Sequence, residues 1–222
     1  MPNPPKQSII VAVDTVIFTV KDGELCALLI QMKKSPYTGL WAFPGGRVEN
    51  TETTEETAVR ILKEQTGVSN VYLEQLKTFD SIERDQLERV ISVASFALIS
   101  SSEVELKTTD KYQDVKWWPV KKLPELAYDH KHIAKEAITR LKSRLQYTNI
   151  AWSLLSEEFT LTDLQRVYEI ILDTTVDKRN FRKRILALDL IVPIGKKRGG
   201  EANRPAELYK FKHKKLEYVE IM

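Results

Sequence analysis

The stretch PGGRVENTETTEETAVRILKEQTGV, residues 44–68, decides the fold. Its paired glycines follow an apolar run, and they permit a tight turn with a close approach of the backbone. A helix is expected from about Thr53 to Thr66, because Thr53 or Thr54 can cap it and the glutamates after them favour the helix dipole. Gly67 is the kind of residue that ends a helix. The stretch therefore predicts a loop, a helix and a second loop.

The spacing of this stretch resembles the Nudix box, the signature of hydrolases that cleave pyrophosphates. Seven positions match the box: Gly46, Glu52, Arg60, Leu62, Glu64, Gly67 and Val68. Two positions differ, since Ile61 and Gln65 stand where the box has glutamates. The resemblance implies a Nudix α/β/α sandwich for the first part of the chain.

The two differences argue against catalysis. Positions 61, 64 and 65 share one face of a helix, and in active Nudix proteins that face carries three carboxylates that hold divalent metal. Hard cations require several oxygen ligands, and only Glu64 remains here. We therefore assign no catalytic residue, metal site or required cofactor, with residual Mg²⁺ binding left open at Glu52, Glu56 and Glu64. The alternative function is an active Nudix hydrolase of ADP-ribose or a related nucleoside diphosphate.

Residues in and around the box are the candidates for ligand binding. Arg84, Asp85 and Arg89 precede an expected strand and resemble a segment of Nudix proteins that handle ADP-ribose. An arginine fork can hold a phosphate by two hydrogen bonds, and the alternative is a loop with mutual salt bridges. The full candidate set is Trp41, Phe43, Arg47, Glu52, Arg60, Glu64, Arg84, Asp85 and Arg89.

The rest of the first 147 residues predicts a sheet and one further helix. Apolar and β-branched runs predict strands at residues 8–20, 25–32, 71–79, 90–99 and 114–120, and an Asp-Gly turn joins the first two. Asp129 is expected to cap a helix from His130 to about Leu145. His130 and His132 are expected to be surface or capping residues, because no acidic or cysteine cluster of metal spacing surrounds them.

The basic residues are unevenly distributed. Residues 177–215 hold thirteen Lys and Arg against four Asp and Glu, a net +9, which leaves −6 for the rest of a chain whose total is +3. Such asymmetry suggests a domain that meets a polyanion, although lysine-rich surfaces also serve solubility alone. No apolar run is long enough to cross a membrane, and the first residues lack a signal-peptide core. With the single Cys26, which excludes a disulfide within one chain, this favours a cytoplasmic location.

Residues 148–222 predict a small winged helix-turn-helix domain. After a short helix at 151–155, a second helix follows Phe159, with capping-box spacing from Thr162 to Gln165. Asp177 caps a third, basic helix that runs to about Leu188. Strands at 190–194 and 208–211 flank a basic loop, residues 195–205, which together predict a wing. The DNA-binding candidates are Lys178, Arg179, Asn180, Arg182, Lys183, Lys196, Lys197, Arg198 and Arg204.

The two halves together resemble the Nudix-related transcriptional regulators of NrtR type, and the α+β fold expected is a Nudix sandwich followed by a winged helix. The resemblance implies a homodimer that binds palindromic double-stranded operator DNA as a repressor. It also implies a small-molecule effector, either ADP-ribose, a related nucleotide or a sugar. Loss of the box carboxylates suits a sensor, because a receptor that destroyed its ligand would erase its own signal. A sensor that docks protein in place of DNA is the remaining alternative.

Overall fold

The structure, a computed structural model, describes residues 8–67, 71–100, 106, 112–200 and 203–221. The elements of the first domain are β1 (Ile10–Lys21), β2 (Glu24–Met32), β3 (Trp41–Ala42), β4 (Gly45–Arg47), α1 (Thr54–Thr66), β5 (Tyr72–Phe79), β6 (Val90–Leu98), β7 (Tyr112–Pro119), η2 (Val120–Lys122) and α2 (His130–Tyr147). Those that follow are η3 (Ile150–Leu154), β8 (Phe159–Thr160), α3 (Leu161–Leu172), α4 (Lys178–Ala187), β9 (Ile191–Gly200) and β10 (Asn203–Phe211).

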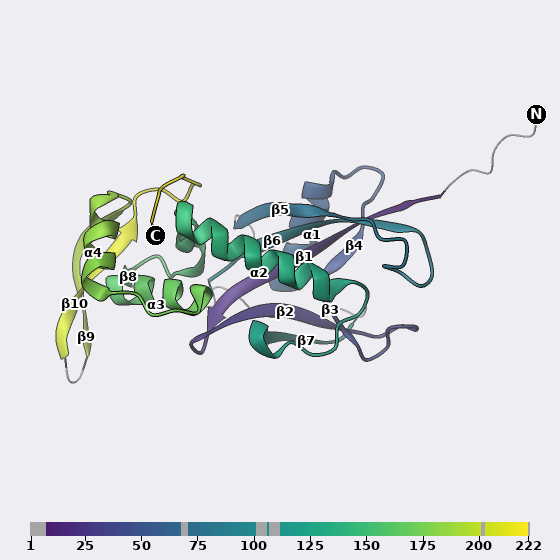
Figure 1. Cartoon of the computed structure of the whole chain (residues 1–222), viewed down its shortest axis with the longest axis horizontal. Helices are drawn as coiled ribbons and strands as arrows, with labels where there is room; N and C mark the ends of the chain where they lie inside the picture. The colour runs from purple at the N-terminus through teal and green to yellow at the C-terminus, as the bar shows by residue number, and fades with distance from the viewer. Residues whose placement is uncertain (1–7, 68–70, 101–105, 107–111, 201–202, 222) are drawn as a thin grey trace, which may run out of the picture.

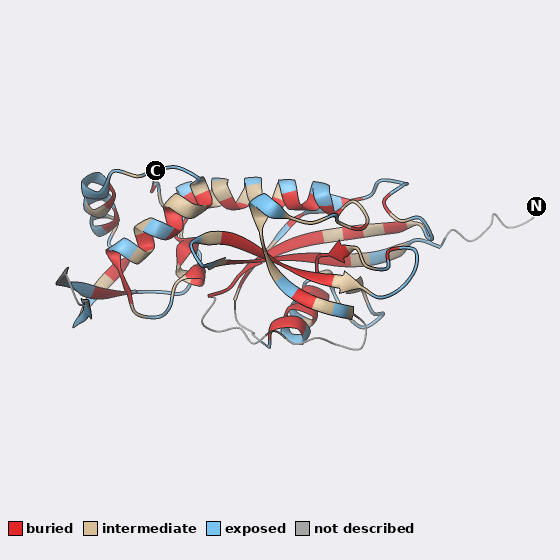
Figure 2. Cartoon of the chain, turned by 90° about the horizontal axis from the view of Figure 1, so that it is seen from below, coloured by how far each residue is buried: buried red, intermediate tan, exposed pale blue. Residues whose placement is uncertain are grey.

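The first domain is a mixed sheet between two helices. Its strands run in the order β3-β2-β1-β6-β5, with β4 paired to β1 and β7 paired to β2, and β1 lies parallel to β6. The long helix α2 covers one face of this sheet and α1 covers the other, so the buried strands lie in the middle layer (Figures 1 and 2). This arrangement confirms the predicted α/β/α sandwich.

The alternation of side chains along β1 explains why both faces of the sheet are covered. Val16 and Phe18 pack in the cluster that includes α2, whereas Ile17 packs with Leu62 of α1 on the opposite face. Because successive side chains of a strand point to opposite faces, a fully apolar strand requires a cover on each side. The Asp-Gly turn between β1 and β2 has both central residues in the left-handed region, as a type I′ hairpin requires.

The helix in the opening stretch forms as predicted. Thr53 caps α1 by accepting a hydrogen bond from the backbone N–H of Glu56, and the Glu56 carboxylate accepts one from the N–H of Thr53. Gly67 ends the helix in the left-handed conformation, at φ 70°. The glycine pair before it is required by contact: a Cβ on Gly45 would lie 2.4 Å from a carboxylate oxygen of Asp14. The predicted close approach of the backbone is therefore present.

The second domain is a winged helix. Helices α3 and α4 pack through Tyr168 and Phe181, whose ring centroids are 5.2 Å apart, and Asp177 caps α4 as predicted. Strands β9 and β10 form the wing, and the short β8 completes their sheet in the order β8-β10-β9. The α+β architecture expected from the sequence is thereby confirmed.

Two local predictions in this domain are wrong. The cap of α3 is Thr160, which exchanges hydrogen bonds with Asp163, while the predicted Thr162 lies inside the helix. The wing strands are also longer than expected, since β9 continues to Gly200 and β10 begins at Asn203, within the predicted loop. Ladder pairing of the two strands outweighs the low strand propensity of glycine there.

Candidate functional site

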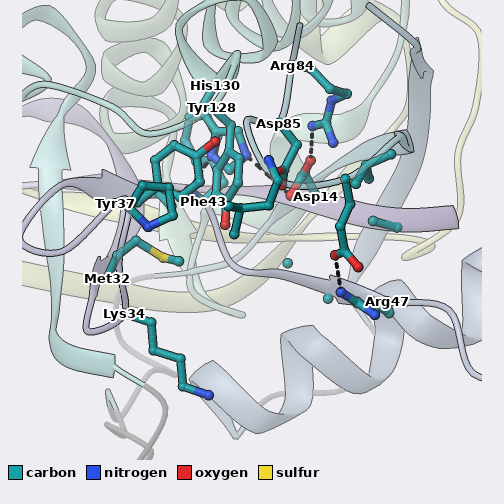
Figure 3. A pocket seen from close by; sticks show the side chains of 18 of the residues that line it. Asp14, Met32, Lys34, Tyr37, Phe43, Arg47, Arg84, Asp85, Tyr128 and His130 are labelled. Carbon is teal, nitrogen blue, oxygen red and sulfur yellow. Dashed lines mark hydrogen bonds and ion pairs between the residues drawn. The ribbon is translucent and has the colours of Figure 1, made fainter. Parts of the chain in front are cut away.

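A cavity of about 310 Å³ lies where β1, the β3–β4 turn, the loop before β6 and the start of α2 meet. Figure 3 shows the rings of Tyr37, Phe43 and Tyr128 gathered on one side of it, and Asp14 with Arg84 on the other. Four of the candidate ligand-binding residues line this cavity: Phe43, Arg47, Arg84 and Asp85. Several other lining residues are not among the ligand-binding candidates from the sequence: Asp14, Lys34, Tyr37, Tyr128 and His130.

A buried cluster of charges forms the floor of this cavity. One guanidinium nitrogen of Arg84 lies 2.8 Å from a carboxylate oxygen of Asp14 and 3.0 Å from one of Asp129. The hydroxyl of Ser92 donates a 2.7 Å hydrogen bond to Asp14. Burial raises the pKa of the Asp14 carboxyl, but His130, Arg84 and the Ser92 hydroxyl lower it, and the net pKa lies well below its usual value. Asp14 is therefore anionic at neutral pH.

His130 holds the backbone of the glycine turn. Its Nδ1 accepts a 2.9 Å hydrogen bond from the backbone N–H of Phe43, so the ring proton sits on Nε2, which lies 3.3 Å from Asp14. Two carboxylates, those of Asp14 and Asp129, face the Arg84 guanidinium in this cluster. The ring also stacks on Phe43, with the centroids 5.5 Å apart. The floor therefore places buried, paired charges beside an aromatic wall.

The start of α2 differs from the prediction in two respects. His130 is 1 % exposed and lies inside the cluster, so it is neither a surface nor a capping residue. Asp129 is the N-cap residue of α2 as predicted, but its side chain makes no capping hydrogen bond, because its carboxylate binds Arg84. The reason is long-range: Asp14 and Arg84 reach this helix from distant parts of the chain. The one pointer in the sequence is Asp14 itself, a carboxylate inside an apolar strand that requires a buried partner.

The carboxylates of the box are committed to other contacts. Arg60 binds Glu52 through two nitrogens, at 2.7 and 2.8 Å, and approaches Glu64 at 3.4 Å. The hydrogen bond from Arg60 is the main cause that lowers the pKa of Glu52 to about 2. Glu56 is occupied in the capping box. A second cavity of about 200 Å³ lies beside this face of α1, lined by Arg60, Ile61, Glu64 and Gln65 among others.

This face of the helix carries few carboxylates. Ile61 is 3 % exposed, and its terminal carbon lies 3.6 Å from the position that a Cβ on Gly46 would take. An alkyl group thus lies next to the glycine turn, at a position where the box has a carboxylate. Gln65 is neutral and buried. Within the described ranges, no group of three or more His, Cys, Asp or Glu side chains is placed to hold a metal ion.

The remaining ligand-binding candidates lie outside the 310 Å³ cavity. Trp41 is buried against Trp118, with ring centroids 5.3 Å apart, so it belongs to the core. Arg89 donates to the backbone carbonyls of Asp80 and Ser81 and holds the loop before β6. The structure thus brings part of the predicted set together and places Trp41, Glu52, Arg60, Glu64 and Arg89 elsewhere.

The DNA-binding candidates fall into two groups. Seven have exposed side chains: Lys178, Arg179, Asn180, Lys183, Lys196, Lys197 and Arg198. Two of these seven, and the half-buried Arg182, also contact their own domain. Arg182 donates to the Thr162 hydroxyl at 3.0 Å, Lys196 pairs with Glu158 at 2.7 Å, and Arg198 pairs with Asp163 at 2.9 Å. The side chain of Arg204 lies outside the described residues. The exposed group forms a cationic surface on α4 and the wing.

Comparison with known proteins shows that each part of the chain matches a family model. Residues 9–141 match the model of the NUDIX domain, and residues 151–211 match that of the NrtR DNA-binding winged helix domain. The predicted boundary at residue 147 lies in the interval between the two matches and stays a prediction. None of the described helices is long and apolar enough to cross a membrane.

Whole-chain similarity extends to a repressor and to solved structures. The chain is 35 % identical over 206 residues to the ADPR responsive transcriptional repressor NtrR of Acinetobacter baylyi, covering 91 % of this chain and 82 % of that protein. A crystal structure of Shewanella oneidensis NrtR with a 27mer DNA matches 91 % of this chain and 93 % of that chain, with a TM-score of 0.82 and 38 % identity. The NUDIX domain of the same protein with ADP ribose matches 63 % of this chain and 94 % of its own, with a TM-score of 0.55 and 37 % identity.

Proposed function

The chain belongs to the Nudix-related transcriptional regulators of NrtR type, and from this premise we propose that it is a DNA-binding repressor that responds to ADP-ribose or a closely related nucleotide. The observation that carries the proposal is the exposed cationic face of α4 and the wing, within a domain that matches a DNA-binding winged helix. The Acinetobacter baylyi relative is named for its response to ADP-ribose, and this supports the choice of effector.

The exposed residues at the start of α4 are proposed to reach base edges. In helix-turn-helix proteins the N-terminal part of the recognition helix enters the major groove. Arg179 can there contact guanine and Asn180 can contact adenine, because both side chains pair with those bases in a bidentate manner. Lys178, Lys183 and Lys197 are assigned to phosphates. Arg182, Lys196 and Arg198 must first release Thr162, Glu158 and Asp163, respectively, to contact DNA.

The 310 Å³ cavity is proposed as the effector site. Its aromatic wall, with Tyr37 and Tyr128 centroids 4.1 Å apart, offers flat surfaces to an adenine ring. The Arg84 guanidinium on the floor is held by two carboxylates, so we assign the diphosphate to another part of the cavity. Sugar hydroxyls can donate to the Asp85 carboxylate, which also lines the cavity. Lys34 and Arg47 at the rim are exposed cations for the diphosphate.

We propose that this Nudix domain acts as a receptor and does not depend on a catalytic metal. Three features of the box support this. Ile61 has an alkyl side chain, Gln65 is neutral, and the Glu52 carboxylate is bound by Arg60. The residues at that face do not fit the ion that Nudix hydrolysis uses, so they offer no route to metal-assisted cleavage. A homodimer on a palindromic operator, and a cytoplasmic location, complete the proposal.

The test is DNA binding by single variants on matched duplexes. Duplexes enriched from a randomised pool by the native protein serve as fluorescent probes for anisotropy titrations. Arg179→Ala is expected to weaken binding by about 1–3 kcal/mol, the worth of one base contact. Lys131→Ala removes the same charge from an exposed position on α2 and is expected to bind as the native protein does. Equal affinity of Arg179→Ala and the native protein would refute the placement of DNA on α4.

A further inference from the structure

The last described residues, Lys215–Ile221, return from the winged helix to the end of α2; we call this segment the C-terminal strap. The backbone N–H of Val219 donates to the carbonyl of Tyr147 at 2.9 Å, and that of Ile221 donates to the carbonyl of Gln146 at 2.8 Å. Figure 1 shows the chain end between the last turns of α2 and the helix α4. The strap thus satisfies carbonyls at the C-terminus of α2, which a helix end leaves without partners.

Asn149, two residues after the end of α2, bonds to the strap. Its side-chain amide donates to the carbonyl of Lys215 at 2.9 Å and accepts from the N–H of Glu217 at 2.9 Å. Its own backbone N–H donates to the carbonyl of Glu217 at 3.1 Å. Asn149 is 1 % exposed, so these three hydrogen bonds are shielded from water. The Asn149 side chain thus pairs with one backbone carbonyl and one backbone N–H of the strap, as a neighbouring strand would.

Arg184 holds the other side of the strap from α4. Its Nε and Nη2 both donate to the backbone carbonyl of Glu220, at 3.1 and 3.0 Å. The carboxylate of Glu220 is 3.6 Å away and its side chain is 84 % exposed, so it adds little. Ile221 is 3 % exposed and packs in the core that the two domains share. One guanidinium therefore joins the helix proposed to read DNA to a segment bonded to α2.

The opposite end of α2 touches the proposed effector cavity. Asp129 and His130 precede and begin this helix, and they contact Arg84, Asp14 and the backbone of Phe43. Helix α2 has 18 residues, which spans roughly 27 Å at 1.5 Å per residue. Its apolar side packs in the same core as the sheet along this length. The helix thus connects the cavity at its first residues with the strap at its last.

We propose that α2 and the C-terminal strap couple the effector cavity to the position of α4, with Asn149 and Arg184 as the positioning residues. The proposal rests on the function proposed above. A nucleotide that binds against His130 favours one placement of α2, and the strap imposes the corresponding placement on α4. Each ligand then changes the affinity for the other, because the two sites bias the same element.

The experiment measures DNA affinity with and without ADP-ribose for three proteins: native, Arg184→Ala and Glu220→Ala. Glu220→Ala is the matched control, because it removes a strap side chain and keeps the carbonyl that Arg184 binds. Allosteric coupling commonly changes affinity by about 5–150-fold. We expect such a change in the native protein and the control, and a change of less than about 2-fold in Arg184→Ala. ADP-ribose binding, measured by calorimetry, is expected to be equal in all three.

The salt dependence of DNA binding separates positioning from a direct phosphate contact. A lost phosphate contact lowers the salt slope by about 1 and weakens binding equally with and without nucleotide. For Arg184→Ala we expect an unchanged slope and a lost response. If that variant responds to ADP-ribose as strongly as the native protein, the strap does not couple the sites. If ADP-ribose does not change the DNA affinity of the native protein, the proposed function itself is refuted. Asn149→Ala, which keeps every charge, is expected to reproduce the lost response.

Discussion

Removal of the Arg84 guanidinium tests the buried charge cluster directly. Arg84→Met keeps the aliphatic stem and leaves the carboxylates of Asp14 and Asp129 without their shared cation. The Arg84 side chain is 4 % exposed and each carboxylate is 11 % exposed, so water cannot replace the lost charge. Breaking a buried pair by removal of one partner costs about 3–5 kcal/mol. We expect a loss of that size in the free energy of unfolding at pH 7, measured by urea denaturation with tryptophan fluorescence.

The stability difference between the native protein and Arg84→Met is expected to depend on pH. In the native protein the pKa of Asp14 lies below its unfolded value, so its contribution to stability is present above the ordinary aspartate pKa and is lost as the pH falls. Without Arg84 the folded pKa of Asp14 rises, and protonation relieves the repulsion with Asp129. The stability gap between native and variant is therefore expected to narrow as the pH falls toward about 4.

An exposed arginine in the same cavity is the control. Arg47 pairs with Glu88, but its side chain is 66 % exposed, and such surface pairs contribute about 0–1 kcal/mol. Arg47→Met is therefore expected to unfold almost as the native protein does. A loss below about 1 kcal/mol for Arg84→Met, or a gap that does not change with pH, would refute the reasoning about the cluster.

Three further outcomes are expected. Gly45→Ala places a methyl group 2.4 Å from a carboxylate oxygen of β1 and should cost about 1–3 kcal/mol in urea unfolding; an unchanged midpoint would exclude the contact. The double variant Ile61→Glu/Gln65→Glu restores carboxylates to the box, and Mn²⁺ should raise its melting temperature while leaving that of the native protein unchanged. Because the pKa of Glu52 is lowered to about 2, its ion pair with Arg60 stabilises the fold above the unfolded pKa of glutamate. This stabilisation is lost as the pH falls toward 2. An NMR titration of Arg60→Met should show a Glu52 pKa near the usual value.

The local chemistry of the chain predicts most of the fold. The limits of α1 follow from Thr53 and Gly67, and the β1–β2 turn follows from its Asp-Gly pair, because each depends on neighbours a few residues away. The wing is longer than its sequence indicates, since glycine and basic residues resemble a loop until a partner strand pairs with them.

The candidate site is less predictable because its residues come from distant segments. Arg84 and Asp14 are 70 residues apart in sequence, and Phe43 and His130 are 87 apart. Local sequence does not predict contacts between residues so far apart. From the sequence, His130 therefore resembles a surface residue at the start of a helix. The same reason hides the C-terminal strap, whose apolar residues carry no helix or strand periodicity and acquire a role only against α2.

The proposal that matters most is that a nucleotide bound in the first domain changes the affinity of the winged helix for DNA. The direct measurement is the affinity of the native protein for its enriched duplex at fixed salt, titrated with ADP-ribose, with the nucleotide assayed afterwards. We predict a saturable change in DNA affinity and recovery of intact ADP-ribose. Unchanged DNA affinity at saturating nucleotide, or conversion of the ADP-ribose to cleaved product in the presence of Mg²⁺, would contradict the claim.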